Sequence, residues 1–234
     1  MSLTGKTVVV TGGMGALGRV VAETAAARGA SVAVLDHATK VPDGLAERLG
    51  ANALFLGGID LSSPAEAEKA MGAVKAKFGR IDALLNIAGG FQWATLEDGA
   101  ADSWDRMYAL NLKTALNASK AALPFLLASG AGRIVNVGAQ SAVHGAAGFG
   151  PYGASKSAVH RLTESLADEL KLKGVTVNAV LPSIIDTPAN RADMPKADFA
   201  RWVAPADLAA VILFLASDEA KAVTGALIPV TGRV

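Results

Sequence analysis

The stretch KTVVVTGGMGALGRVVAETAAARG, from Lys6 to Gly29, decides the fold. Its three consecutive valines form a short β-branched run of the kind found in buried parallel strands. A glycine-rich turn follows the valines. After the turn, apolar residues recur at helical spacing until Gly29, a typical helix stop. The stretch therefore predicts a strand over 6–12 and a helix over 15–29, joined by the glycine turn.

The turn between this strand and helix has the properties of an anion-binding site. The first amide groups of a helix have no intrahelical partners, and the helix dipole favours negative charge beside them. Gly12 permits the tight turn, Gly15 lets the backbone approach a pyrophosphate, and Gly18 lets the helix lie close to the strand. A glycine turn could also simply join two elements, since TGGMGALG is not the GxGxxG form. The order of strand, turn and helix favours a dinucleotide site.

An acidic residue ends the second predicted strand, which covers 31–35. The carboxylate of Asp36 can accept hydrogen bonds from the two ribose hydroxyls of an adenosine, and it would repel a 2′-phosphate. The glycine turn itself contains no arginine or lysine, and Arg19 and Lys40 only flank it. These residues predict NAD(H) as cofactor in preference to NADP(H).

The composition excludes several classes of site. The net charge is +1 with both signs spread along the chain, so nothing indicates nucleic acid or an anionic membrane as a partner. The absence of cysteine excludes disulfides, iron–sulfur clusters and thiolate zinc sites, and three scattered histidines predict no metal site. The N-terminus lacks the apolar segment of a signal peptide, and no apolar stretch is long enough to span a bilayer. The expected location is the cytoplasm.

Strands and helices alternate along the whole chain, which predicts an α/β fold. We expect a single doubly wound Rossmann-type domain over 1–234, with a parallel sheet of about seven strands and helices on both faces. The further strands are expected at 53–58, 81–86, 133–137, 174–182 and 226–230. The further helices are expected near 43–50, 64–77, 103–127, 151–173 and 207–217.

Residues at the carboxyl ends of strands are candidates for cofactor contacts, because open parallel sheets bind ligands there. Asp60 and Leu61 follow the third strand, and an adenine-side contact is expected, with a turn aspartate as the alternative. Asn86, Ala88 and Gly89 follow the fourth strand, where small residues let a cofactor lie against the backbone.

Tyr152 and Lys156 are the candidates for acid–base chemistry. They lie four apart on a helix that begins at Pro151, hence on one face. An ammonium beside a phenol lowers the pKa of the tyrosine and tunes it for proton transfer. Such a pair is commonly a surface contact, but here it follows the strand expected beside the cofactor.

Two asparagines lie in the predicted helix 103–127. Asn111 stands between Leu110 and Leu112, in the more apolar part of the helix, which favours an inward-facing side chain. Asn117 serves as the comparison and is expected to have no role.

These motifs together resemble the short-chain dehydrogenase/reductase family from about Gly5 to Gly232. TGGMGALG is similar to its cofactor turn, with Ala16 in place of a usual glycine. NIAG is similar to its NNAG element, and LPSIIDT is similar to its PG…T segment with Ser183 for glycine. Asn111, Tyr152 and Lys156 fall where the family has its catalytic asparagine, tyrosine and lysine.

One position departs from the family pattern. The catalytic serine usually lies thirteen residues before the tyrosine, and Ala139 stands there. Ser141 is expected to take its place if the backbone stays extended, and a loop serine is the alternative. The departure indicates a branch, because 138–162 and 181–202 resemble segments of dihydropteridine reductases. Those enzymes lack the serine, keep the tyrosine and lysine, and favour NADH.

The resemblance implies hydride transfer between a nicotinamide and a small carbonyl, alcohol or pterin-like substrate. It implies that Tyr152 passes the proton, that Lys156 binds the nicotinamide ribose, and that Asn111 anchors a water in a proton relay. A polar, proline-bearing segment over about 183–204 is expected to form a substrate lid. The implied cofactor contacts are Gly12, Met14, Gly15, Leu17, Asp36, Asp60, Leu61, Asn86, Ala88, Gly89, Tyr152, Lys156, Pro182, Ile185 and Thr187.

Alternatives remain open from the sequence. One is a reductase of a 3-oxoacyl thioester or another ketone, and another is a dinucleotide-binding regulator with weak or no activity, which Ala139 permits. Phe91, Trp93 and Trp202 are candidates for an aromatic-walled pocket that suits a planar ring, with ordinary core packing as the alternative. The family forms dimers and tetramers through the helices 103–127 and 151–173, so a homodimer or homotetramer is expected.

Overall fold

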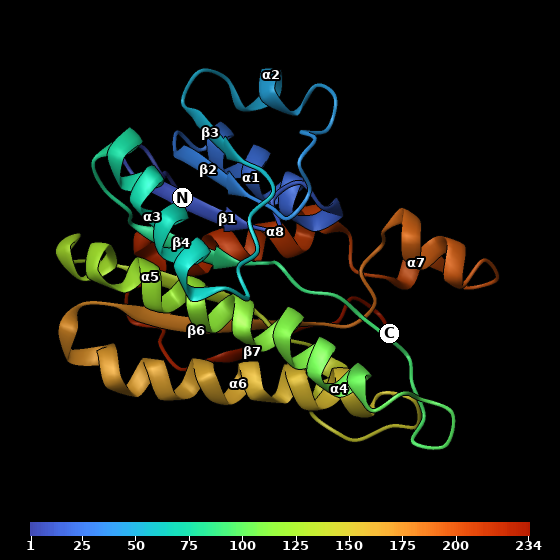
Figure 1. The fold of residues 1–234 in the computed structure, drawn as a ribbon. Coiled ribbons are helices and arrows are strands. Elements are labelled where there is room, and N and C mark those ends of the chain that lie inside the picture. Colours follow the sequence, from blue (N-terminus) through green and yellow to red (C-terminus); the bar gives the residue numbers. More distant parts are fainter.

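A single parallel sheet runs through the computed structural model, which describes residues 1–234 (Figure 1). Its strand order is β3-β2-β1-β4-β5-β6-β7, and every neighbouring pair is parallel. The expected doubly wound fold is confirmed. The strands are β1 (Thr7–Thr11), β2 (Ser31–Leu35), β3 (Ala53–Leu56), β4 (Ala83–Asn86), β5 (Arg133–Val137), β6 (Thr176–Pro182) and β7 (Leu227–Val230).

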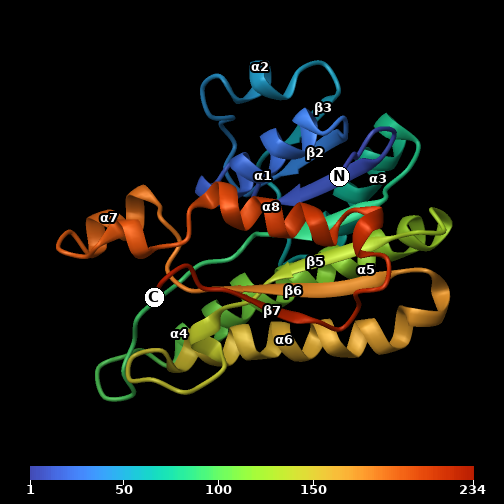
Figure 2. The same ribbon diagram turned by 180° about the vertical axis from the view of Figure 1, so that it is seen from behind.

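Helices cover both faces of this sheet. Figure 1 shows α3 (Pro64–Phe78), α5 (Thr114–Ala128) and α6 (Gly150–Leu170) on the near face. Figure 2, the view from behind, shows α1 (Ala16–Ala27) and α8 (Pro205–Leu215) on the other face. The short α2 (Leu45–Leu49) lies at the α1 edge of the molecule. None of these helices combines the length and the hydropathy that a membrane span requires.

The valine run of β1 explains how both faces are filled. Val8 and Val10 belong to the core cluster that includes α1 and α8, and Val9 belongs to the cluster that includes α3 and α5. Successive side chains of a strand point to opposite faces, so a strand covered on both sides is apolar at every position. The sequence therefore shows a continuous run here and no alternation.

The strand order reverses between β1 and β4, and this reversal places the site. β1 pairs with β2 on one side and β4 on the other. The connections leaving β1 and β4 diverge at their carboxyl ends, which opens a crevice there. The glycine turn after β1 and the Ala88–Gly90 turn after β4 both lie at this edge.

Two predicted segments differ in the structure. The helix expected over 103–127 is divided into α4 (Asp102–Met107), a π-helical segment η1 (Tyr108–Lys113) and α5. The segment 183–204 has structure of its own, since it contains α7 (Pro188–Asp193) and the 3₁₀ turn η4 (Phe199–Arg201). The remaining 3₁₀ turns are η2 (Gln140–Ala142), η3 (Lys171–Lys173) and η5 (Asp218–Ala220).

Candidate active site

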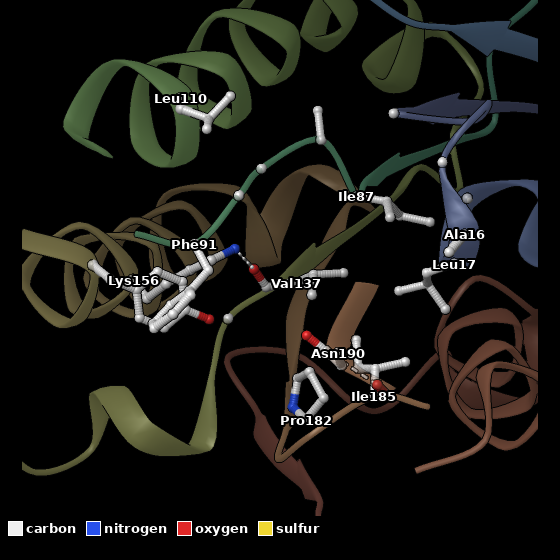
Figure 3. Close-up of a pocket in the computed structure, with 18 of the residues that line it drawn as sticks. Ala16, Leu17, Ile87, Phe91, Leu110, Val137, Lys156, Pro182, Ile185 and Asn190 are labelled. Carbon is white, nitrogen blue, oxygen red and sulfur yellow. Dashed lines mark hydrogen bonds between the residues drawn. The ribbon is translucent and has the colours of Figure 1, made fainter. Parts of the chain in front are cut away.

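A cavity of about 1250 Å³ lies at the carboxyl edge of the sheet. It extends from the glycine turn, through the turn after β4, to Tyr152 and the α7 segment (Figure 3). In Figure 3, Ala16 and Leu17 lie on one side, and Phe91 and Lys156 lie on the other. Most of the predicted cofactor and catalytic residues line it: Gly12, Met14, Gly15, Leu17, Asp36, Asp60, Leu61, Ala88, Gly89, Ser141, Tyr152, Lys156, Pro182 and Ile185.

Close backbone packing explains the glycines of the first turn. Gly12 has φ +63°, and a Cβ there would lie 2.8 Å from the Cα of Ala88. A Cβ on Gly18 would lie 2.1 Å from the carbonyl oxygen of Gly12. Larger residues at either position would push the helix start away from the sheet. The turn thus brings the start of α1, with Gly15 at its N-cap, to the edge of the cavity, where a helix start favours an anion.

Asp36 joins the glycine turn to β2. Its carboxylate accepts the N–H of Met14 at 2.8 Å and the N–H of Ala38 at 2.9 Å. Each carboxylate oxygen has a second lone pair, so the group can still accept ribose hydroxyls. Lys156 is the one lysine or arginine among the residues that line the cavity, and neither Arg19 nor Lys40 reaches it.

Asn117 is structural, and the expectation that it has no role is wrong. It is buried, and its Nδ2 donates to the carbonyl oxygens of Leu61 at 3.0 Å and Ser62 at 2.9 Å. Next to this segment, Asp60 accepts the N–H of Ser62, and this hydrogen bonding lowers the pKa of Asp60. Asn117 therefore fixes the backbone that presents Asp60 and Leu61 to the cavity.

Asn86 does not line the cavity, contrary to expectation. Its side chain is buried and donates to Asn136 Oδ1 at 2.8 Å and to Ser119 Oγ at 3.0 Å. The cavity wall after β4 is formed instead by the residues that follow it, from Ile87 to Gly90. Asn86 is the last residue of β4, and its buried hydrogen bonds anchor the start of this turn to the sheet and to α5.

Asn111 faces inward as expected, although it too lies behind the cavity wall. Its Oδ1 accepts the N–H of Gly90 at 2.9 Å, and its Nδ2 donates to the carbonyl of Gly90 at 3.1 Å. The same Nδ2 donates to Ser155 Oγ on α6 at 2.9 Å. Asn111 thus connects η1, the turn after β4 and the helix that carries Tyr152 and Lys156.

Burial dominates the pKa values of the tyrosine and lysine. It raises the pKa of Tyr152 to about 12 and lowers the pKa of Lys156 to about 8. The ammonium of Lys156 donates to the carbonyl oxygen of Val137 at 2.8 Å, as Figure 3 shows. The expectation that this ammonium lowers the pKa of the phenol is therefore not met in the free protein. At neutral pH, Tyr152 is protonated.

Ser141 is expected to take the place of the missing serine if the backbone after β5 stays extended. The backbone does not stay extended. Ala139 is extended, with φ −159° and ψ 139°, but the 3₁₀ turn η2 begins at Gln140. Ala139 is buried, while Gln140 and Ser141 both line the cavity. Ser141 reaches the cavity through this turn.

The aromatic wall differs from the predicted one. Phe91, Phe149 and Tyr152 form a cluster, with ring centroids of Phe91 and Tyr152 4.9 Å apart and those of Phe91 and Phe149 5.3 Å apart. Trp202 is buried against Phe199, and neither Trp93 nor Trp202 lines the cavity. Phe149 was missed because it lies in a glycine-rich loop without periodicity.

Trp93 instead connects the two loops that carry these rings. A Cβ on Gly148 would lie 1.8 Å from Trp93 Nε1, so the indole packs directly on the glycine. Beside it, the N–H of Ala94 donates to the carbonyl of Gly148 at 2.9 Å. The loop after β4 and the loop before α6 are thereby packed together.

The α7 segment contributes residues that were not predicted. Thr187 does not line the cavity, because its hydroxyl caps α7 by accepting the N–H of Asn190 at 3.2 Å. Asn190, Asp193 and Met194 line the cavity instead. The sequence TPAN, with threonine before proline, is the signal of a helix start that could have indicated α7. No group of three or more acidic or histidine side chains is placed to hold a metal ion.

Known proteins resemble this chain over its whole length. The family model for short chain dehydrogenase matches residues 6–198. A 3-oxoacyl-[acyl-carrier-protein] reductase of Salmonella typhimurium is 34% identical, over 99% of this chain and 98% of the relative. A meso-2,3-butanediol dehydrogenase of Serratia marcescens is 35% identical, over 99% of this chain and 95% of the relative.

Solved structures give the same result. A short-chain type dehydrogenase/reductase from Mycobacterium ulcerans has a TM-score of 0.93 and 30% identity, and the match covers 100% of this chain and 90% of that one. Levodione reductase has a TM-score of 0.89 and 26% identity, with 98% and 97% covered. The chain belongs to the short-chain dehydrogenase/reductase family of oxidoreductases, which use nicotinamide dinucleotide cofactors.

Proposed function

We propose that this protein uses NAD(H) to transfer hydride to or from a small uncharged carbonyl or alcohol, or a pterin-like ring, and that Tyr152 carries the proton. The observation that carries this proposal is a single cavity with the glycine turn at one end and Tyr152 and Lys156 at the other. Gly12 and Ala88 lie in contact, and both turns line the cavity, so a dinucleotide backbone can lie across them at the edge of the sheet.

The protein residues supply placement and proton transfer, and the bound nicotinamide supplies the hydride. The phenol of Tyr152 is protonated at neutral pH, so it holds the proton that reduction of a carbonyl consumes. Phe91 and Phe149 pack against its ring and hold its direction. Lys156 lies one turn further along α6 and is the candidate for the nicotinamide ribose.

The preference for NAD(H) rests on the charges at the adenosine end. Asp36 lies there, and no lysine or arginine at that end lines the cavity. A 2′-phosphate would face the carboxylate without a cation to neutralise it. Steady-state measurements with the two reduced cofactors should give the lower KM for NADH, and a lower KM for NADPH would contradict this assignment.

Tyr152→Phe tests the catalytic role directly. The substitution removes one hydroxyl and keeps the ring that packs on Phe91, so NADH binding should be unchanged. Loss of the general acid should lower kcat by a factor of about 10²–10⁴. Tyr108→Phe, an exposed tyrosine on η1, is the matched control and should keep full activity. Near-full turnover by Tyr152→Phe would show that another group passes the proton.

A second candidate is reduction of a 3-oxoacyl thioester, which the identity to the Salmonella typhimurium reductase favours. Three features favour a small planar or neutral substrate instead. Ala139 stands at the serine position, aromatic rings flank Tyr152, and the α7 side of the cavity carries Asp193 without a cation beside it. NADH oxidation with quinonoid dihydropterin, a neutral ketone panel and an acetoacetyl thioester would separate the candidates. Preference for the thioester would replace the first assignment with the second.

A further inference from the structure

Helix α6 contacts the end of β5 through two side chains in successive turns. Lys156 Nζ donates to the carbonyl of Val137 at 2.8 Å. Four residues later on the same helix face, His160 Nε2 accepts the backbone N–H of Ala139 at 3.3 Å. The two hydrogen bonds lie on either side of Gly138, where a Cβ would lie 2.5 Å from His160 Nε2. The imidazole therefore lies directly against this corner of the backbone.

The surroundings of His160 keep its imidazole neutral, which allows Nε2 to accept a hydrogen bond. The side chain is 4% exposed, and burial, together with the positive charges of Lys156 and Arg161, lowers its pKa to about 4. The imidazole is neutral at pH 7, so Nε2 has a free lone pair when the proton is on Nδ1. The N–H of Ala139 is buried and would have no partner without it, which is costly.

The backbone at Val137–Ala139 determines the position of the cavity wall that follows it. The turn η2 starts immediately after it, and η2 carries Gln140 and Ser141 into the cavity. Ala139 supplies no hydroxyl, so polar contacts to a substrate from this wall come from those next residues. A displacement of about 1 Å in such groups can cost about a hundredfold in rate.

We propose that His160 is a positioning residue of this active site: by accepting the Ala139 N–H, it holds η2 so that Gln140 and Ser141 face the substrate. This assignment rests on the proposed oxidoreductase function, but the placement of η2 can be measured without turnover.

Two substitutions of His160 separate hydrogen bonding from packing. Glutamine can place its amide oxygen near the position of Nε2 and accept the same N–H, whereas leucine fills the volume and accepts nothing. His160→Leu should lower kcat about ten- to a hundredfold and leave the NADH dissociation constant within about threefold, because the glycine turn is unaffected. His160→Gln should restore kcat to within about fivefold of the wild type. Hydrogen–deuterium exchange of the peptide covering 138–142 should accelerate in His160→Leu and stay slow in His160→Gln.

Thr163→Val is the matched control, since Thr163 also connects α6 to β5. Its hydroxyl accepts from Asn136 Nδ2 at 2.8 Å, within the sheet. This variant should lose thermal stability but keep kcat and the exchange rate of 138–142.

The proposal is overturned if His160→Leu keeps full kcat and slow exchange, or if His160→Gln matches His160→Leu. Failure of both His160 variants to fold would also overturn it, because hydrogen-bond acceptance would then not explain the position. If the wild type turns over no substrate on the panel, the proposed function fails, while the exchange measurement still decides whether His160 holds η2.

Discussion

At the residue scale, the protonation of Tyr152 and Lys156 is set by burial more than by their proximity in sequence. The lysine is 6% exposed and bonded to a backbone carbonyl, so its charged form is destabilised by the loss of water. The tyrosine is packed against two phenylalanine rings and keeps its proton. A tyrosine and a lysine four residues apart on a helix thus do not by themselves lower the pKa of the tyrosine.

The lysine shift predicts a pH limit for the free enzyme. Burial lowers the pKa of Lys156 to about 8, so the ammonium is present below that pH and is lost as the pH rises through it. If the ammonium is needed to bind the nicotinamide ribose, kcat/KM for NADH should fall above about pH 8, since this parameter reports groups of the free enzyme. Initial rates between about pH 6 and 10 measure it. A profile that stays flat to pH 10 would show that the charge of Lys156 is not required.

The sequence could predict which residues approach the cofactor at this scale, but not which lie one layer behind it. The positions of Gly12 and Asp36 follow from the order of strand, turn and helix, and both line the cavity. Asn86 sits next to that wall in sequence, yet it faces the buried side of the sheet, because its partners Asn136 and Ser119 come from distant segments. Such partners depend on the tertiary packing, which no local spacing encodes.

At the element scale, the π-helical segment η1 and the helix α5 each carry one asparagine that supports one end of the cavity. Asn111 holds Gly90 at the Tyr152 end, and Asn117 holds Leu61 and Ser62 at the adenosine end. The periodicity of 103–127 predicted one continuous helix. It could not show the π-helical segment, because an extra residue in a turn changes backbone hydrogen bonds without changing which residue types are apolar.

Alanine substitutions of these asparagines should therefore change different kinetic parameters. Asn111→Ala removes three hydrogen bonds near Tyr152 and should lower kcat about tenfold or more. Asn117→Ala releases the backbone at Leu61 and should raise the KM for NADH severalfold while kcat is kept. Both should lose stability of about 1–3 kcal/mol, measured by urea unfolding. A change of the same parameter in both variants would contradict this division.

The 183–204 segment also shows that the sequence could place a segment at the cavity without identifying which of its residues line it. Its prolines and polar residues predicted a lid, and the segment does border the cavity. The short α7 within it begins with the cap that Thr187 provides, so Thr187 is used for folding the segment and Asn190, Asp193 and Met194 line the cavity. Mobility of the segment stays a prediction.

At the scale of the whole molecule, apolar side chains remain exposed along α4, η1 and α5. Trp104 is 45% exposed, Tyr108 is 49% exposed and Leu116 is 38% exposed. These residues lie on one of the two helices through which relatives of this fold are expected to associate, so a homodimer or homotetramer stays the prediction.

Leu116→Glu tests this association. A carboxylate in an apolar interface without a partner is costly, so the variant should show a lower mass by light scattering coupled to size-exclusion chromatography. Leu96→Glu, on the exposed loop before α4, adds the same charge and should leave the mass unchanged. A wild type that elutes as a monomer would refute the predicted assembly outright.

The contact between Trp93 and Gly148 has a consequence for how new specificities arise in this scaffold. Because the indole occupies the space that a side chain at 148 would need, a homologous segment without glycine there fits only if Trp93 moves or is exchanged with it. Grafting the two segments together preserves the wall around Phe91 and Phe149, whereas a single-segment chimaera without glycine at 148 forces a tryptophan and a foreign side chain into the same volume.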